Sequence, residues 1–312
     1  MCQITTDKYQ TDPQMISYLA ENGFLIRSPA KGIYGFTKKF EAIVQIIQDI
    51  ISSCVENISG FEKLAFPPIM SVDSYNKTNH LELFPNLVGA LCGYAGDKAQ
   101  HMQMLAAQEE NKDWASGLGS LELVMVPAAC YPVYPALKGK LQAPVRKFDL
   151  LGQIFRNEPS DEISRLQSFR QRELLCVGDA ALVDQHREVW LQLAPKIFEC
   201  LGLPVEIVEA NDPFFGRKGG FMAATQRQQK LKYEAVVSIC SGREKTAIAS
   251  FNVHGNYFGS SFDIFGVDGD FAHSSCVGFG LERIAMAVIS EFQYQLDAWL
   301  SERNEKNWHG EL

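Results

Sequence analysis

The sequence predicts an α+β protein in which an antiparallel sheet is flanked by helices. Residues 154–176 begin and end with short apolar runs and have a polar turn between them, the pattern of two paired strands. Residues 276–289 are typical of a glycine-rich apolar strand that enters a helix, where Leu281, Ala285 and Val288 recur at helical spacing. Residues 38–58 show an apolar face at the same spacing. Paired strands beside amphipathic helices favour this layered architecture.

The composition is typical of a globular protein with a full core. The chain has 312 residues, of which 46% are hydrophobic and 21% are charged, enough for one large domain or two small ones. The net charge of −8 argues against a general nucleic-acid binder, because such proteins carry a basic surface. We expect no membrane span and no signal peptide, since no apolar run is long enough and the start is not basic. Eight cysteines without CxxC pairs favour a reducing cytoplasm.

The first third of the chain divides into an extension and the start of a main domain. Residues 1–60 are expected to form an N-terminal helical extension whose helix, 38–58, serves packing. Residues 61–312 are expected to form the main domain, and its tandem prolines at 67 and 68 prevent a regular helix or central strand there. Beyond the prolines the pattern predicts a helix over 100–112, a loop over 114–119 and a strand over 121–126 that leads to Cys130.

The remaining elements follow from the same apolar periodicities. Gly202 is a typical helix stop, and it follows a helical pattern. The predicted elements are a helix over 183–201, strands over 205–208 and 246–251, and a terminal helix within 290–312 followed by a polar tail.

The predicted hairpin places charged and aromatic side chains on one face. Alternation along a strand points Arg156 and Glu158 to one side, and likewise Phe169, Gln171 and Glu173. Guanidinium groups grip phosphate oxygens, and a phenylalanine ring can stack on a base, so this face suits a nucleoside triphosphate. The alternative is a surface hairpin with solvated charge pairs.

The second stretch adds a basic residue at an unusual position. Glu282 and Arg283 fall in the first turn of the predicted helix. The macrodipole disfavours an arginine there unless an anion compensates, which is consistent with a bound phosphate.

Together these stretches resemble the motifs of class II aminoacyl-tRNA synthetases. FRNE followed by RLQSFRQRE, residues 155–173, is similar to motif 2 of that family, and GFGLER, residues 278–283, is similar to motif 3. FEKLAFPPIM, residues 61–70, is a weaker candidate for motif 1, where the family places its dimer interface. The resemblance implies a class II synthetase-like antiparallel sheet, a catalytic domain over 61–312 and a homodimer.

A narrower resemblance concerns three candidate metal ligands. Cys130, Glu173 and Cys276 match the positions at which the atypical, methanogen-type seryl-tRNA synthetases hold zinc. The same triple in a chain of this length resembles the amino acid:[carrier protein] ligases, truncated relatives that load an amino acid onto a carrier protein. Three protein ligands would leave zinc an open position for the α-amine of the substrate. His273 is a competing ligand outside the family pattern, and a lone cysteine such as Cys130 is more often a buried apolar residue.

The resemblance implies roles for further residues and three cofactors, ATP, Zn²⁺ and Mg²⁺. Arg156 would stabilise the α-phosphate, and Arg283 with Arg165 would hold the γ-phosphate. Phe169 would stack on adenine, and Glu158 would bind the adenine amino group. The positions assigned to ATP are Arg156, Glu158, Arg165, Leu166, Phe169, Lys232 and Arg283. Those assigned to a small amino acid, glycine or alanine, are Cys130, Glu173, Ala247, Ile248, Ala249 and Ser250. His254, which follows the predicted strand 246–251, is interpreted as a structural histidine.

A basic segment, residues 213–233, stands out in the acidic chain. It contains no acid and five basic residues: Arg217, Lys218, Arg227, Lys230 and Lys232. It is either a solvated loop and strand face or a dock for an acidic carrier protein with a phosphopantetheine arm. We expect tRNA not to be the acceptor, because the N-terminal extension is shorter than the tRNA-binding arm of seryl enzymes. The alternatives are a minimal seryl-type tRNA ligase and a non-catalytic, nucleotide-binding paralogue.

Overall fold

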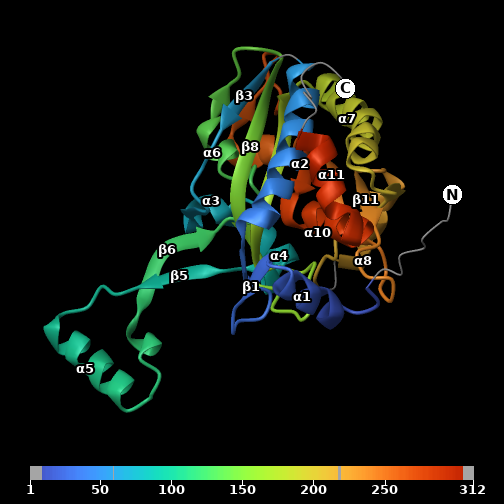
Figure 1. Ribbon diagram of the computed structural model, residues 1–312. Helices are drawn as coiled ribbons and strands as arrows, with labels where there is room; N and C mark the ends of the chain where they lie inside the picture. The colour runs from blue at the N-terminus through green and yellow to red at the C-terminus, as the bar shows by residue number, and fades with distance from the viewer. Residues whose placement is uncertain (1–8, 59, 217–218, 305–312) are drawn as a thin grey trace.

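The computed structural model describes residues 9–58, 60–216 and 219–304, and its centre is a seven-stranded sheet (Figure 1). The strand order is β10-β11-β12-β14-β9-β8-β3, and neighbours are antiparallel except for β3 and β8. The strands are β3 (Phe61–Leu64), β8 (Val145–Phe155), β9 (Ser168–Gly178), β10 (Glu206–Glu209), β11 (Lys232–Val237), β12 (Thr246–Gly255) and β14 (His273–Gly280). The predicted α+β class with an antiparallel sheet is confirmed.

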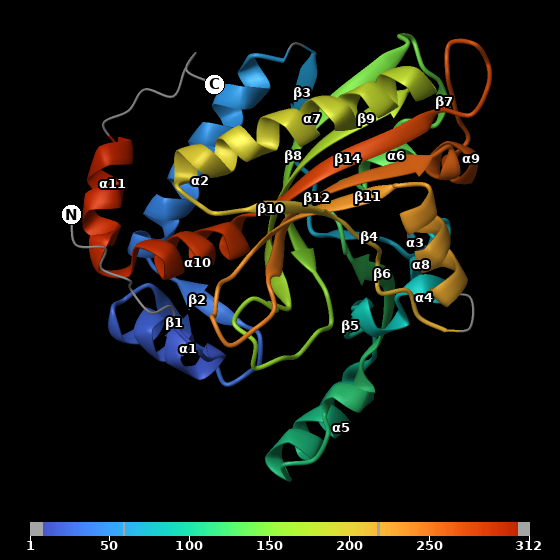
Figure 2. The same ribbon diagram turned by 90° about the vertical axis from the view of Figure 1, so that its right-hand side faces the viewer.

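Three long helices cover one face of this sheet (Figure 2). They are α2 (Lys38–Glu56), α7 (Ala180–Leu201) and α10 (Leu281–Phe292), and they pack on one another as well as on β9, β12 and β14. Their apolar faces form the core together with the sheet, where Phe40, Trp190 and Phe279 are fully buried. Burial of this size is the main stabilising contribution to the fold. The opposite face of the sheet is left for a cavity.

The central hairpin confirms the prediction for residues 154–176, with longer strands than expected. β8 and β9 pair from Val145↔Gly178 to Phe155↔Ser168, and residues 156–167 connect them. Apolar runs alone understate these strands, because ion-paired residues such as Asp149 and Arg172 interrupt them inside the core. The alternation is as predicted: Phe169, Gln171 and Glu173 face the cavity, while Arg172 contacts α2.

The N-terminal region contains more than the expected helix. Helix α1 (Asp12–Glu21) and a small hairpin of β1 (Leu25–Arg27) and β2 (Tyr34–Phe36) precede α2. The prediction of a helix over 38–58 is confirmed, with its end at Glu56. Helix α2 shares one hydrophobic core with the sheet. The predicted domain boundary at residue 60 therefore stays a prediction from the sequence.

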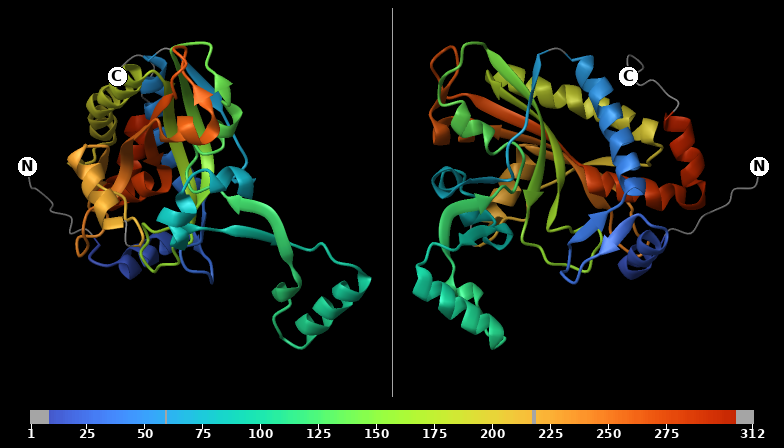
Figure 3. Two further views of the ribbon diagram at one scale, coloured as in Figure 1. Left: turned by 180° about the vertical axis from the view of Figure 1, so that it is seen from behind. Right: turned by 60° about the vertical axis from the view of Figure 1, so that its left-hand side comes forward.

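The part of the chain between β4 and the central hairpin forms an arm that projects from the body (Figures 1 and 3). Its three-stranded sheet has the order β4-β6-β5, and α5 lies at its tip without a buried residue. The elements of this region are β4 (Ile69–Ser71), α3 (Val72–Asn76), α4 (His80–Leu83), η1 (Pro85–Leu87), β5 (Ala90–Gly93), α5 (Lys98–Glu109), η2 (Ala115–Gly117) and β6 (Gly119–Met125). The expected helix over 100–112 and strand over 121–126 are confirmed, each shifted by about two residues.

The other short elements include one difference from the prediction. The basic segment 213–233 is predicted to be either a solvated loop and strand face or a dock for an acidic partner, but about half of it forms helix α8 (Gly219–Gln228) before β11. The terminal helix predicted within 290–312 is confirmed as α11 (Leu296–Asn304), which follows the end of α10 at Phe292 and Gln293, a residue with a positive φ of 38°. The polar tail predicted after it falls on residues 305–312, which lie outside the described residues. The remaining elements are α6 (Val133–Ala136), β7 (Gly139–Lys140), α9 (Tyr257–Phe262), β13 (Ile264–Phe265) and η3 (Gln293–Gln295). Among the described helices, none has the length and apolarity to cross a bilayer.

Candidate active site

A cavity of about 640 Å³ lies on the sheet face opposite the three long helices. Side chains of β9, β12 and β14 form its floor. Its walls come from the loop 156–167, the loop 239–245, the turn around Cys130 and residues near Asp212. Segments far apart in the sequence therefore meet here, which is typical of a ligand site.

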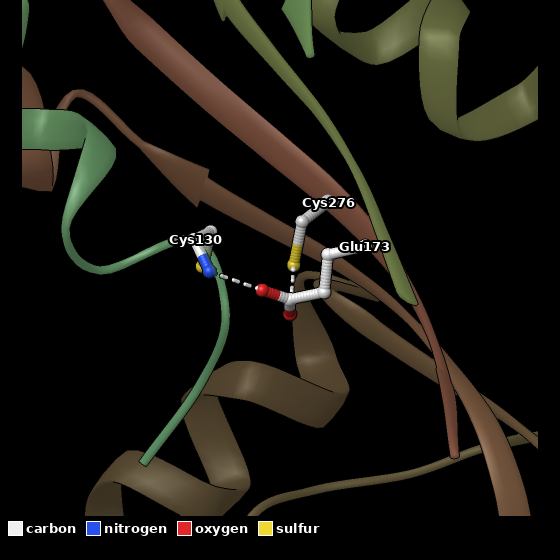
Figure 4. Close-up of side chains that lie close together, drawn as sticks. All are labelled: Cys130, Glu173 and Cys276. Carbon is white, nitrogen blue, oxygen red and sulfur yellow. Dashed lines mark hydrogen bonds between the residues drawn. The ribbon is translucent and has the colours of Figure 1, made fainter. Parts of the chain in front are cut away.

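Three candidate metal ligands meet at one end of this cavity. The ligand atoms of Cys130, Glu173 and Cys276 all lie within 4.8 Å of one another, and the three residues are buried. Glu173 Oε2 accepts from the backbone N–H of Cys130 at 2.5 Å, and Glu173 Oε1 lies 3.7 Å from Cys276 Sγ. Figure 4 shows the carboxylate of Glu173 between the loop of Cys130 and the strand of Cys276. Among the described residues this is the group whose spacing suits a metal ion.

Neighbouring polar groups on β12 and β14 surround the sulfur of Cys276. Asn252 Nδ2 donates to Sγ at 3.7 Å, and His254 Nε2 lies 3.6 Å from it. The other ring nitrogen of His254 lies 3.0 Å from Ser274 Oγ. A hydroxyl proton donated to that nitrogen leaves the ring proton on Nε2, facing the sulfur. His254 is thus hydrogen-bonded like a structural histidine, but it stands beside the candidate metal centre. His273 is three residues from Cys276 on the same strand and projects to the opposite face.

The electrostatics of this group fit a divalent cation. Burial raises the pKa of Glu173 to about 8, and the neighbouring Cys276 adds to the shift. A hydrogen bond between the two thiols raises the pKa of Cys130 and lowers that of Cys276, so Cys276 is the preferred thiolate. Two sulfurs and a carboxylate cannot all carry negative charge when buried together without a compensating cation. Thiolate and carboxylate oxygen are ligands that zinc accepts, so the donor set fits zinc.

Two arginines and a phenylalanine occupy the other end of the cavity. The guanidinium carbon of Arg156 lies 5.7 Å from the ring centroid of Phe169, and that of Arg283 lies 5.6 Å from it. Arg156 Nε donates to Pro127 O at 3.1 Å, and Arg283 donates from Nε to Ser164 O at 2.7 Å. Within the described chain neither arginine forms an ion pair with a carboxylate. Burial lowers the pKa of Arg283 to about 10, and the neighbouring positive charge of Arg156 is the second largest cause. Two buried or half-buried guanidinium groups that form no ion pair among the described residues favour the binding of an anion here.

The remaining residues assigned to ATP lie in different settings. Glu158 and Arg165 line the cavity and form an ion pair with each other at 3.4 Å. Arg165 also pairs with Glu162. The side chain of Leu166 is 2% exposed and belongs to the core, so it contributes nothing to the cavity wall.

Lys232 lines the cavity and is not part of a basic surface. Its side chain is buried, and Nζ pairs with Asp212 Oδ1 at 2.5 Å and with Glu234 Oε1 at 2.9 Å. Gln226 on α8 holds the other oxygen of Asp212 at 2.8 Å. Of the five basic residues in segment 213–233, Arg217 and Lys218 lie outside the described residues and Lys230 pairs with Glu209.

All four residues assigned to the amino acid on β12 line the cavity. Ala247 supplies a carbonyl that accepts from Arg283 Nη1 at 3.0 Å. Ser250 Oγ accepts from Asn252 Nδ2 at 3.2 Å, which joins this strand to the polar groups around Cys276. The two expected binding regions, for the nucleotide and for the amino acid, are therefore continuous within one cavity.

The arginines that alternate with the cavity face have a structural role. Arg172 forms a buried ion pair with Asp149 at 2.7 Å and donates to Gln48 O of α2. Arg170 donates to Glu41 of α2 and to Glu282 of α10. These contacts tie the hairpin to both helices, and they explain why a stretch so rich in arginine lies inside the fold.

Sequence reasoning missed several residues that line the cavity. These are Asp12, Asp212 and Arg243. None lies within a recognised motif, and each comes from a loop or a helix end far from the hairpin in sequence. Periodicity offered no signal for them, because only the tertiary fold brings these segments together.

No family model matches the chain, but individual relatives do. The chain is 40% identical over 270 residues to a protein of Bradyrhizobium diazoefficiens named amino acid–[acyl-carrier-protein] ligase 1, covering 86% of this chain and 82% of that protein. A type-2 serine–tRNA ligase of Methanocaldococcus jannaschii is 25% identical, over 95% of this chain and 59% of its own length.

A solved structure shares the fold. It is titled as a complex of A. aeolicus tRNASec with M. kandleri SerRS, and it superposes with a TM-score of 0.81 at 19% identity. The match covers 97% of this chain and 62% of that chain. At this identity the likeness concerns the fold, and it agrees with the class II synthetase-like sheet expected from the motifs.

Proposed function

The chain belongs to the family of amino acid–[acyl-carrier-protein] ligases, and from this premise we propose its reaction in detail. It is a ligase that attaches an amino acid to a carrier protein. In the proposed reaction a small amino acid, glycine or alanine, is first activated with ATP to an aminoacyl-adenylate. It is then transferred to the phosphopantetheine thiol of the carrier.

One observation above all supports this reaction. Arg156 and Arg283, both without a carboxylate partner in the described chain, flank Phe169 in the same cavity that holds Cys130, Glu173 and Cys276. An anion site with an aromatic ring suits ATP, and a buried cluster of metal ligands suits recognition of a small polar substrate. Their sharing of one cavity allows the two substrates to meet.

In the first step the carboxylate of the amino acid attacks the α-phosphorus of ATP, and pyrophosphate leaves. Arg156 stabilises the negative charge that builds on the α-phosphate, and Arg283 with Arg165 holds the departing phosphates. Arg165 must leave its ion pairs with Glu158 and Glu162 to do so. Phe169 stacks on adenine, and Glu158 accepts from its amino group. Lys232, held by Asp212 and Glu234, would contact the nucleotide with its ammonium group from the cavity wall. Mg²⁺ accompanies the phosphates of ATP.

The metal end of the cavity positions the amino acid. Cys130, Glu173 and Cys276 would hold zinc, which supplies a Lewis acid for binding the free α-amine. Asn252 and His254 hold the sulfur of Cys276 in place. The small side chains of Ala247, Ala249 and Ser250 in the cavity wall favour glycine or alanine. Catalysis in this proposal is mainly positioning and charge neutralisation.

In the second step the carrier thiol attacks the acyl carbon of the adenylate. The thiol gives up its proton, a thioester bond forms, and AMP leaves with the electron pair of the broken mixed-anhydride bond. An acidic carrier would dock beside α8, where Arg227 is exposed. We also propose a homodimer, because the motif 1-like segment forms β3 at the edge of the sheet, and a cytoplasmic location, in keeping with the free cysteines.

The test is ATP–pyrophosphate exchange on zinc-loaded protein with each amino acid in turn. Label is then offered to phosphopantetheinylated carrier protein or to bulk tRNA. Exchange with glycine or alanine and label on the carrier is the expected result. Label on tRNA would make the protein a minimal synthetase instead. Absence of exchange with every amino acid would leave a nucleotide-binding paralogue.

A further inference from the structure

We propose that Asp12, on helix α1, is a positioning residue for ATP, because its single carboxylate joins the two loops that border the nucleotide end of the cavity. The proposal rests on the proposed function for the identity of the nucleotide. The joining itself is a property of the fold. Nothing in the motifs points to it, since Asp12 precedes the hairpin by more than a hundred residues.

Each carboxylate oxygen of Asp12 accepts a hydrogen bond from a different loop. Oδ1 accepts from the backbone N–H of Ile163 at 2.9 Å, in the loop 156–167. Oδ2 accepts from Arg243 Nε at 2.8 Å, in the loop 239–245. Asp12 is 4% exposed, and both loops line the cavity. A buried carboxylate with a backbone and a guanidinium partner is a strong, directional link.

Further contacts of residues 9–36, here called the N-terminal clasp, hold the same two loops. Gln167 donates from its backbone to Gly32 O at 2.8 Å and from its side chain to Lys31 O at 2.7 Å. On the other loop, Ser241 N donates to Tyr9 O at 2.8 Å and Gly242 N to Gln10 O at 3.1 Å. A Cβ on Gly242 would lie 2.3 Å from Gln10 O, so the clasp approaches this loop closely.

The N-terminal clasp affects nucleotide binding through residues of the loop 156–167. Ser164, next to Ile163, offers the carbonyl that orients Arg283 at 2.7 Å. Arg165 is the next residue in this loop, and it forms an ion pair with Glu162. Arg243 pairs with the same carboxylate of Glu162 at 2.8 Å. When ATP draws Arg165 away, Arg243 still neutralises Glu162. Asp12 thus keeps the loop in place while its arginine changes partner.

The predicted consequence separates positioning from mere packing. Asp12→Asn keeps an acceptor for Ile163 but loses the charge that Arg243 needs, and Asp12→Ala loses both. We expect the KM for ATP to rise about tenfold in Asp12→Asn and further in Asp12→Ala. The KM for the amino acid should stay within about twofold, because Glu173 and the cysteines lie at the other end of the cavity.

The experiment combines exchange kinetics with hydrogen exchange of the free protein. Arg27→Ala is the matched control, since Arg27 is exposed and contacts Ser17 within the clasp rather than a loop. Hydrogen exchange of residues 157–167 should accelerate at least about tenfold in Asp12→Asn, with strand β9 unchanged. Unchanged loop exchange, or an equal loss for ATP and amino acid, would overturn the proposal. Wild-type protein without pyrophosphate exchange would refute the proposed function, and the hydrogen exchange would still decide whether Asp12 orders the loop.

Discussion

The carboxylate of Glu173 stands 3.7 Å from the sulfur of Cys276, on neighbouring strands of the central sheet. Glycine at position 278, opposite Glu173 in the register, makes room for this arrangement: a Cβ there would lie 3.4 Å from Glu173 Oε1 and 2.8 Å from Gln171 Nε2. Gln171 in turn accepts from Ala129 N at 3.2 Å and so supports the turn of Cys130. The candidate metal site is therefore shaped by strand register as well as by its three candidate ligands.

Cys130→Ser should lose zinc and amino acid binding together. A hydroxyl is a poor replacement for a thiolate at zinc, and we expect zinc affinity to fall more than about 100-fold. Metal content after dialysis and calorimetry with the amino acid measure the two effects. Cys92→Ser is the control, because Cys92 is exposed on the arm. Retention of both zinc and amino acid in Cys130→Ser would remove the metal from the proposed mechanism.

Zinc binding should displace protons and strengthen as pH rises. Burial raises the pKa of Glu173 from 4.5 to about 8 in the metal-free protein. Between pH 4.5 and about pH 8 the folded protein binds more protons than the unfolded chain. The free energy of unfolding therefore falls as the pH rises through this range. Each displaced proton should increase zinc affinity about tenfold per pH unit between about pH 6 and 8.

Two measurements check this pH dependence. Zinc affinity is obtained by competition with a chromophoric chelator across the range. The metal-free stability of wild type is compared with that of Glu173→Gln, which has no carboxylate to titrate. The stability difference should change with pH. A difference that stays constant, together with a flat zinc affinity, would contradict the assignment of Glu173.

Arg156→Ala should abolish adenylate formation while the fold is retained. In the proposed mechanism its guanidinium, which lies over the ring of Phe169, stabilises the α-phosphate, and losing one preorganised charge of this kind costs about 100-fold or more in rate. The pyrophosphate exchange rate and the thermal unfolding midpoint are the measurements. Arg146→Ala is a matched control on β8, because Arg146 pairs with the exposed Glu62 outside the cavity. Normal exchange in Arg156→Ala would disprove the role.

Arg227→Glu should weaken carrier loading without affecting activation. An exposed charge at the rim of a docking surface acts on association, so we expect the KM for the carrier to rise about three- to tenfold, and less so at high salt. Lys196→Glu, exposed on α7, makes the same charge change on another surface. Equal effects of the two substitutions would place the carrier elsewhere, and slower pyrophosphate exchange in Arg227→Glu would mean that the residue acts in the first step.

Local pattern in the sequence was enough for the sheet class, for the central hairpin and for most helices. Alternation along β9 correctly separated Phe169, Gln171 and Glu173 from Arg170 and Arg172, because a strand has a period of two wherever it lies. The triple Cys130, Glu173 and Cys276 could be named from its resemblance to a family. Such features depend on neighbours in sequence or on a motif, and both are visible in one chain.

The tertiary structure alone decided which of the charged residues face one another. Asp12 reaches Arg243 and Ile163, and Lys232 is buried against Asp212 rather than exposed in a basic patch. About half of segment 213–233 forms helix α8, although its sequence has the charge pattern of a solvated loop. Ion pairs and buried carboxylates depend on distances of a few ångströms between segments remote in sequence, and local propensity contains no information on those distances.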